Sequence, residues 1–221
     1  MNENLIGAIA IIVGFLFLFY INKWDLVDMT GLAKKSAVNG MPSLAESMSM
    51  TLESGRTDIR QGELVRKTKQ YELTILPDLN RISVSFNQQL GIYLLDKKDP
   101  RKANRPKNLN GVDFAAPSLN KIFLEHLATN ERSAKRLTDN PDVEQALLAF
   151  FDSWGGRKLS SFSLRDDTLH VVFEYRGYLP LSLIQDATPL IVNFADAITK
   201  KTAKSTSKNI SKTTDISNET Q

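Results

Sequence analysis

Two histidines are the side chains best suited to acid–base or metal chemistry in this chain, which has no cysteine. His126 lies in SLNKIFLEHLAT, a stretch expected to be helical, on the side that carries Ile122. His170 alternates with Leu169 and Val171, as it would on a strand. The histidines are far apart in sequence, and neither has a carboxylate or a second histidine at metal-ligand spacing. We interpret both as structural histidines and predict no catalytic, cofactor-binding or metal-ligating residues.

Two short polar stretches raise the question of phosphate or proton chemistry. Gly155-Gly156-Arg157-Lys158 brings glycines and cations together, but it lacks the frame of a P-loop and follows a predicted helix instead of a strand. We predict a helix cap and a turn there. Asp166-Asp167 separates two predicted strands, where aspartate is favoured because its side chain hydrogen-bonds the turn backbone. We interpret this pair as a hairpin turn.

The sequence contains no G-x-S-x-G motif and no metalloprotease motif. Catalytic triads assemble in three dimensions from residues that are distant in sequence, so a membrane-bound hydrolase remains the alternative interpretation. The leading expectation is a protein without enzymatic activity.

Residues Leu5 to Ile21 form an uncharged apolar run. At 1.5 Å per residue the run rises about 25 Å, close to the hydrocarbon thickness of about 30 Å. Tyr20 and Trp24 lie where interfacial aromatic residues are usually found. The run has no polar face. No basic residue precedes it and no small-residue cleavage site follows it, as they would in a signal peptide. We predict an uncleaved membrane anchor at residues 1–24.

The orientation of the anchor follows from the lysines near its ends. Lys23, Lys34 and Lys35 follow the apolar run, and no basic residue precedes it. Because positive charge near a span favours the cytoplasmic side, we expect the following domain to be cytoplasmic, on a single-pass cell-membrane protein. An extracytoplasmic domain is the competing interpretation, and the absence of cysteine is compatible with both.

Composition divides the remaining chain into three parts. Residues 25–62 are interrupted by glycine and proline, which predicts a stalk with one or two short helices. Residues 63–199 carry most of the apolar periodicity and suffice for one domain with a sizeable core. Residues 200–221 are rich in serine, threonine and lysine. They have too few apolar side chains to offset the entropy of ordering, so we predict a disordered tail.

The formal net charge is +3, and the tail accounts for it with five lysines against two acidic residues. A second basic stretch, Lys97 to Lys107, is marked as a loop by Pro100 and Pro106. We expect the loop and the tail either to contact anionic lipid weakly or to be solvated. No aromatic residue is interleaved with the cations of the loop, so we predict no specific nucleic-acid partner.

Strand patterns dominate the first half of the domain. YELTIL, RISVSF and LGIYLL alternate apolar and polar residues, which predicts an antiparallel meander, and SFSLRDDTLHVVFEY predicts a hairpin. Helical periodicity appears in SLNKIFLEHLAT, NPDVEQALLAFFDSWGG and DATPLIVNFADAITKK. In the second of these, Asn140 is the expected cap and Pro141 the first helical residue. The order predicts an α+β fold, with meander and hairpin packed against about three helices behind one N-terminal transmembrane helix.

The domain also carries a wider pattern, with Phe114, then Leu137-Thr138, a helix, and Ser161-Phe162 on a strand. In this pattern the chain resembles the C-terminal α+β domain of uncharacterised bacterial membrane-anchored proteins. Many of those proteins have several apolar spans, whereas one is predicted here. The resemblance implies a bacterial membrane-anchored protein and supplies no catalytic residues. Together with the anchor and stalk, it leads us to expect a binding or scaffolding domain whose partner is another membrane-associated protein.

Overall fold

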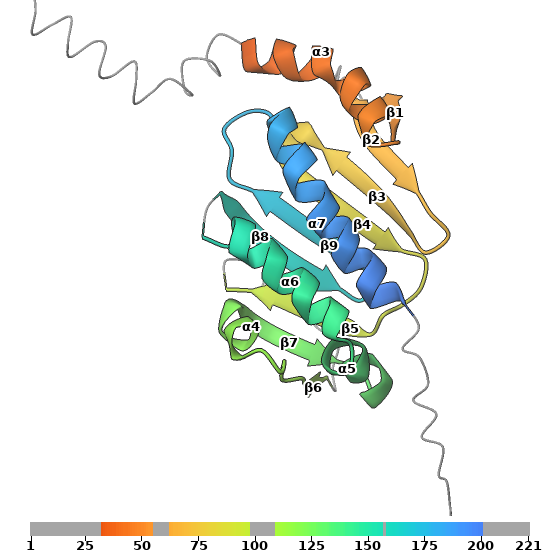
Figure 1. Ribbon diagram of the computed structural model, residues 1–221, viewed down its shortest axis with the longest axis vertical. Helices are drawn as coiled ribbons and strands as arrows, with labels where there is room; N and C mark the ends of the chain where they lie inside the picture. Colours follow the sequence, from red (N-terminus) through yellow and green to blue (C-terminus); the bar gives the residue numbers. More distant parts are fainter. Residues whose placement is uncertain (1–31, 55–61, 98–108, 157, 201–221) are drawn as a thin grey trace, which may run out of the picture.

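The computed structural model describes residues 32–54, 62–97, 109–156 and 158–200 (Figure 1). Within these ranges the chain forms one antiparallel sheet of nine strands and five α-helices, so the α+β class is confirmed. No helix in these ranges is both long and apolar enough to cross a membrane. The predicted anchor, most of the basic loop and the tail after Lys200 lie outside the described residues.

The strands of the sheet follow the order β1-β2-β3-β4-β9-β8-β5-β7-β6, and neighbouring strands are antiparallel. They are β1 (Thr51–Ser54), β2 (Gly62–Lys67), β3 (Tyr71–Leu76), β4 (Arg81–Phe86), β5 (Ile92–Asp96), β6 (Asn110–Gly111), β7 (Phe123–Ala128), β8 (Leu159–Arg165) and β9 (Thr168–Phe173). A short 3-10 helix, η1 (Pro77–Leu79), joins β3 to β4.

Five helices lie on one face of this sheet. They are α3 (Leu32–Ser47), α4 (Pro117–Ile122), α5 (Glu131–Thr138), α6 (Pro141–Trp154) and α7 (Leu181–Thr199). Helices α6 and α7 run side by side across the middle of the sheet, α4 and α5 pack beside α6, and α3 packs beside α7 (Figure 1). The described part of the molecule therefore has two layers, one of helices and one of strands.

The β8–β9 hairpin is confirmed, with its turn at Asp166-Asp167. Asp166 has a φ of 53°, in the left-handed region that aspartate tolerates better than most residues. Its Oδ1 also accepts a hydrogen bond from the N–H of Gly91 at 2.7 Å, which ties the turn to the start of β5. The carboxylate pair is thus a structural turn.

The predicted meander is wrong in its third strand. β3 and β4 pair directly, with Leu73 opposite Val84. β5 does not follow them, because the β8–β9 hairpin lies between β4 and β5 in the sheet. Alternation along the sequence identifies a strand but not its partner, and consecutive strands are neighbours only about two-thirds of the time.

The helix predicted over SLNKIFLEHLAT is correct only in its first half. α4 ends at Ile122, and the chain continues directly into β7, where Leu94 of β5 lies opposite His126. The apolar residues of this stretch fit a helical stripe, but hydrogen bonding to β5 and β6 outweighs that pattern. One consequence is visible at Leu124, which is 44% exposed on the strand.

Helix α6 has the ends that the sequence predicts. The Asn140 side chain accepts a hydrogen bond from the N–H of Asp142 at 3.2 Å, and Pro141 is the first helical residue. The helix stops at Trp154, just before the paired glycines. α7 is longer than predicted, because it begins at Leu181 instead of near Asp186.

Part of the segment predicted as a stalk, residues 25–62, is built into the domain. β1 pairs with β2 along the edge of the sheet, and Met41 and Leu44 of α3 are buried in the main core. A Cβ added at Gly40 would collide with the side chain of Leu181, so α3 and α7 approach closely. The packing of α3 and β1 into the domain was not predicted, because the glycines and proline of residues 25–62 are typical of a linker.

Phe162 of β8 lies at the centre of the core. Its ring centroid is 5.2 Å from Phe151, 5.5 Å from Phe150, 5.8 Å from Phe123 and 5.9 Å from Phe194. These five residues, which we call the aromatic cluster, join two strands to α6 and α7. Tilted and edge-to-face ring pairs of this kind stabilise a core beyond the area that they bury.

We predict that Leu44→Ala lowers the free energy of unfolding by about 2–5 kcal/mol, because it leaves a cavity between α3 and the sheet. Urea titration of the full-length protein in detergent measures this. Glu46→Ala, on the exposed side of the same helix, is the matched control and should change stability by less than about 0.5 kcal/mol. Equal stability of both variants would mean that α3 is only a linker.

Candidate binding surface on the open sheet face

Strand β8 shows how the two faces of the sheet differ. Successive side chains of a strand point to opposite faces, so Phe162 and Leu164 point toward the helices. Ser161, Ser163 and Arg165 point to the other side. None of the described helices lies on that side, which we call the open sheet face.

A row of small polar residues crosses the open sheet face at its centre. Thr74 of β3 lies opposite Ser83 of β4, and Ser83 lies opposite His170 of β9. His170 in turn lies opposite Ser163 of β8. Directly opposed residues have Cβ atoms about 4.5–5.5 Å apart, so the four side chains form a continuous polar strip.

One hydrogen bond organises the strip. Ser83 Oγ lies 3.0 Å from Nδ1 of His170, so the two side chains are hydrogen-bonded. Ser83 and Ser163 are buried, whereas Thr74 and His170 are half-buried. Among the described residues, Ser163 Oγ has no hydrogen-bond partner.

Basic side chains flank the strip on both sides. Arg81 lies opposite Val172, and Arg165 lies opposite Thr168. The open-face positions of the four central strands are Arg81, Ser83 and Ser85 on β4, Thr168, His170 and Val172 on β9, Ser161, Ser163 and Arg165 on β8, and Tyr93 and Leu95 on β5. None of these residues is a carboxylate, but Glu72 of β3 lies opposite Ser85 and Glu125 of β7 lies opposite Leu95 on the same face. The centre of the face is therefore hydroxyl-rich, with basic and acidic groups around it.

The β8–β9 turn borders this surface. Burial, followed by the negative charges of Asp166 and Asp167, raises the pKa of Tyr93. Tyr93 therefore stays a neutral phenol around neutral pH. A neutral phenol can both donate and accept a hydrogen bond at the edge of the strip.

The structure does not bring the two histidines together. His126 lies on the helix-covered face, where its Nδ1 contacts the carbonyl oxygen of Val112 and its ring lies 6.1 Å from that of Phe114. β7 and β9 are separated by β8 and β5, a distance of about 14 Å across the sheet. Within the described ranges, no group of three potential metal ligands gathers at one place.

The other stretches singled out in the sequence have structural positions. Gly155 donates its N–H to the carbonyl oxygen of Phe151 at 2.8 Å and so closes α6, as predicted for a helix cap. Arg157 lies outside the described residues. Phe114 and Leu137, two residues of the family resemblance, are buried in the core. These two positions therefore serve packing.

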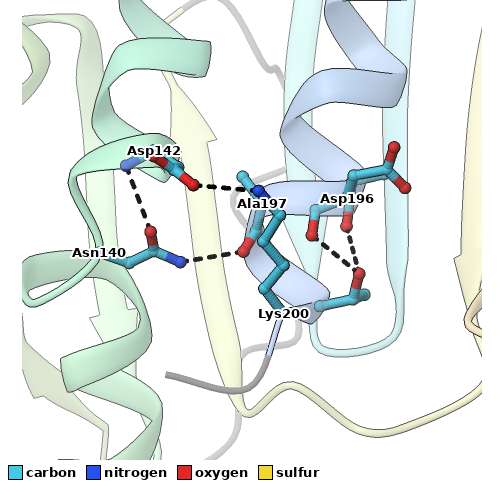
Figure 2. Close-up of polar contacts among 7 residues, drawn as sticks. Asn140, Asp142, Asp196, Ala197 and Lys200 are labelled. Carbon is cyan, nitrogen blue, oxygen red and sulfur yellow. Dashed lines mark hydrogen bonds and ion pairs between the residues drawn. The ribbon is translucent and has the colours of Figure 1, made fainter. Parts of the chain in front are cut away.

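A second polar cluster fastens the start of α6 to the end of α7 (Figure 2). Asn140 Nδ2 donates to the carbonyl oxygen of Ala197 at 2.9 Å, and Lys200 Nζ lies 3.1 Å from Oδ2 of Asp142. The two helices are therefore antiparallel. This arrangement places Asp142 at the positive end of one helix dipole and Lys200 at the negative end of the other.

The end of α7 is also tied to the sheet. The Tyr71 hydroxyl donates to Oδ1 of Asp196 at 2.8 Å, and Thr199 Oγ1 donates to Oε1 of Gln70 at 3.0 Å. Burial, together with the hydrogen bond and charge of Asp196, raises the pKa of Tyr71 to about 12. This cluster holds the helix layer in register over the sheet.

No protein-family model matches this chain, and no curated protein does. Among solved structures, it is similar to the crystal structure of the mycobacterial trehalose monomycolate transport factor A, TtfA, with a TM-score of 0.42 and 12% sequence identity. The alignment covers 76% of this chain and 94% of that chain.

Of the open sheet face, only His170 stands out in the sequence as a candidate for chemistry. A signal was present: RISVSF and SSFSLR both place serine at alternate positions. That alternation indicates one polar face on each strand. It does not indicate that β4, β9 and β8 are neighbours, so the strip as a surface emerges only from the fold.

We predict that stability falls between about pH 10 and pH 12 through the ionisation of Tyr71. Its pKa is about 12 in the folded protein and about 10 when unfolded, so the folded state keeps the proton longer. The stabilisation is fully present below pH 10 and is lost as the pH rises, by about 2–3 kcal/mol in total. Urea titrations across this range measure it. In Tyr71→Phe the free energy of unfolding should fall less between pH 10 and pH 12 by this amount. The same pH dependence of stability in both proteins would show that Tyr71 does not cause the loss.

Proposed function

We propose that this chain is a membrane-anchored binding or scaffolding protein that contacts another membrane-associated protein through the open sheet face. The observation that carries the proposal is the polar strip on a sheet whose described helices all lie on the opposite side. Residues 5–21 supply the anchor in this proposal, and it rests on their uncharged apolar sequence.

The composition of the open sheet face suits contact with a protein. Ser85 is exposed, and Thr168, His170 and Tyr93 are half-buried, so hydroxyls, an imidazole and a phenol are accessible as hydrogen-bonding groups. Arg81 and Arg165 supply positive charge. Val172 is half-buried on the same face, so some apolar area is accessible beside the polar groups. An apolar part surrounded by polar groups is the usual anatomy of a protein interface.

The alternative, a membrane-bound hydrolase, draws support from the Ser83–His170 hydrogen bond alone. A serine nucleophile also needs N–H donors that stabilise the oxyanion. Ser83 lies inside β4, which is hydrogen-bonded to β3 on one side and to β9 on the other. Its backbone is therefore committed to the sheet, and the pair fits a structural and recognition role better than a catalytic one.

We predict that Thr168→Glu reduces co-purification of a membrane-protein partner from mild detergent by about tenfold. The change places a carboxylate on a surface whose central positions carry none, which opposes a complementary partner. Quantitative mass spectrometry of the purified complex measures the loss.

The matched control is Ser182→Glu, an exposed position on α7 in the other layer. It should leave the amount of partner unchanged, and both variants should show the thermal unfolding of the parent protein. Recovery of the parent protein as a clean monomer, or equal losses in the two variants, would contradict the proposal.

We further propose that the domain is cytoplasmic, because Lys23, Lys34 and Lys35 follow the apolar run. Alkaline phosphatase and a fluorescent protein that folds only in the cytoplasm, fused separately after Gln221, distinguish the two topologies. We predict fluorescence without phosphatase activity. The opposite pair of results would place the domain outside the cytoplasm.

A further inference from the structure

The two helices at the centre of the helix layer, α6 and α7, carry only acidic side chains among their charged residues. These residues are Asp142, Glu144 and Asp152 on α6, and Asp186 and Asp196 on α7. Neither helix contains a lysine, an arginine or a histidine. Asp152 and Asp186 are exposed. The outer surface of the two helices therefore suits a basic segment.

A basic segment begins at the end of α7. Lys200, the residue after the helix, already reaches across to α6, where its Nζ lies 3.1 Å from Oδ2 of Asp142 (Figure 2). Lys201, Lys204 and Lys208 follow it in the sequence, outside the described residues. The first cation of the tail thus pairs with the first carboxylate of the acidic surface.

We propose that the lysine-rich C-terminal tail turns back at Lys200 and docks on the acidic outer surface of α6 and α7. The occupant of this surface is the chain's own segment 200–212. Docking pairs these carboxylates with lysines, because neither helix contains a cation of its own. It also blocks this surface to other basic partners, so that a protein partner binds at the open sheet face.

The spacing of charges fits this path. Asp142, Gln145, Ala149 and Asp152 are exposed along one side of α6, and Asp152 lies about 15 Å from Asp142 along the helix axis. An extended chain covers about 3.3 Å per residue, so Lys204 lies up to about 13 Å beyond Lys200. With Lys200 on Asp142, the side chain of Lys204 therefore reaches Asp152.

The docked tail and a lipid-bound tail use the same lysines and exclude each other. Exposed ion pairs are individually weak and are screened by salt, with a Debye length of about 10 Å at 0.1 M. We therefore expect docking at low ionic strength and release at high ionic strength or on anionic vesicles. This behaviour distinguishes an electrostatic contact from an apolar one.

Because the natural chain has no cysteine, disulfide cross-linking tests the contact in the full-length protein in detergent. The variant pairs Ala149→Cys on α6 with Ser205→Cys beside Lys204. We predict a cross-linking rate about fivefold higher at low salt than at high salt, as expected for two weak ion pairs. Phosphatidylserine vesicles should lower the rate, and phosphatidylcholine vesicles should not.

Charge variants of the cross-linking protein provide the control. Asp152→Asn and Lys204→Gln should each lower the low-salt rate toward the high-salt value, and the charge swap Asp152→Lys with Lys204→Asp should restore it. Circular dichroism verifies that each variant remains folded. A rate that is independent of salt and of these charges would overturn the proposal. Binding of the tail to anionic vesicles without any low-salt cross-link to α6 would also overturn it and assign the tail to lipid.

Discussion

The packing of Phe162 against four other aromatic rings holds the sheet and the helices of this domain together. Phe162 comes from β8, while its partners come from β7, α6 and α7. It therefore fixes which face of the sheet the helices cover. Because side chains alternate along β8, burying Phe162 turns Ser161 and Ser163 to the opposite side. One core residue thus determines where the polar strip lies.

The same packing puts the hydroxyl-rich open sheet face and the acidic surface of α6 and α7 on opposite sides of the molecule. The hairpin that carries Phe162 lies between β4 and β5, which brings Arg81, Arg165 and His170 onto neighbouring strands of the open sheet face. The helices held by the aromatic cluster carry only carboxylates among their charged residues. The hydrogen bond from Asn140 to the carbonyl oxygen of Ala197 joins the start of α6 to the end of α7. The tail therefore begins next to the acidic surface of the two helices. The proposed partner therefore binds the open sheet face, and the tail binds the opposite side, on the helices.

Local patterns in the sequence predicted the α+β class, the β8–β9 hairpin and the cap of α6 at Asn140. These features depend on residues close together in the chain, where alternation and capping act directly. The patterns failed where the structure depends on pairing between residues that are distant in the sequence. β5 is not a neighbour of β4, and β7 replaces half of a predicted helix. α3 and β1 are part of the domain and not of a stalk. The candidate surface depends on the same long-range pairing. His170 was visible in the sequence, but its place beside Ser83 and Ser163 was not.

If the open sheet face contacts a partner in the membrane environment, it should be shielded there and free after purification. Single-cysteine variants Ser85→Cys, on this face, and Ser182→Cys, on the helix layer, measure this through the rate of their reaction with a maleimide. Both should react readily in the purified protein. In native membranes Ser85→Cys should be protected while Ser182→Cys still reacts, and equal reactivity of Ser85→Cys in the two settings would rule out the contact.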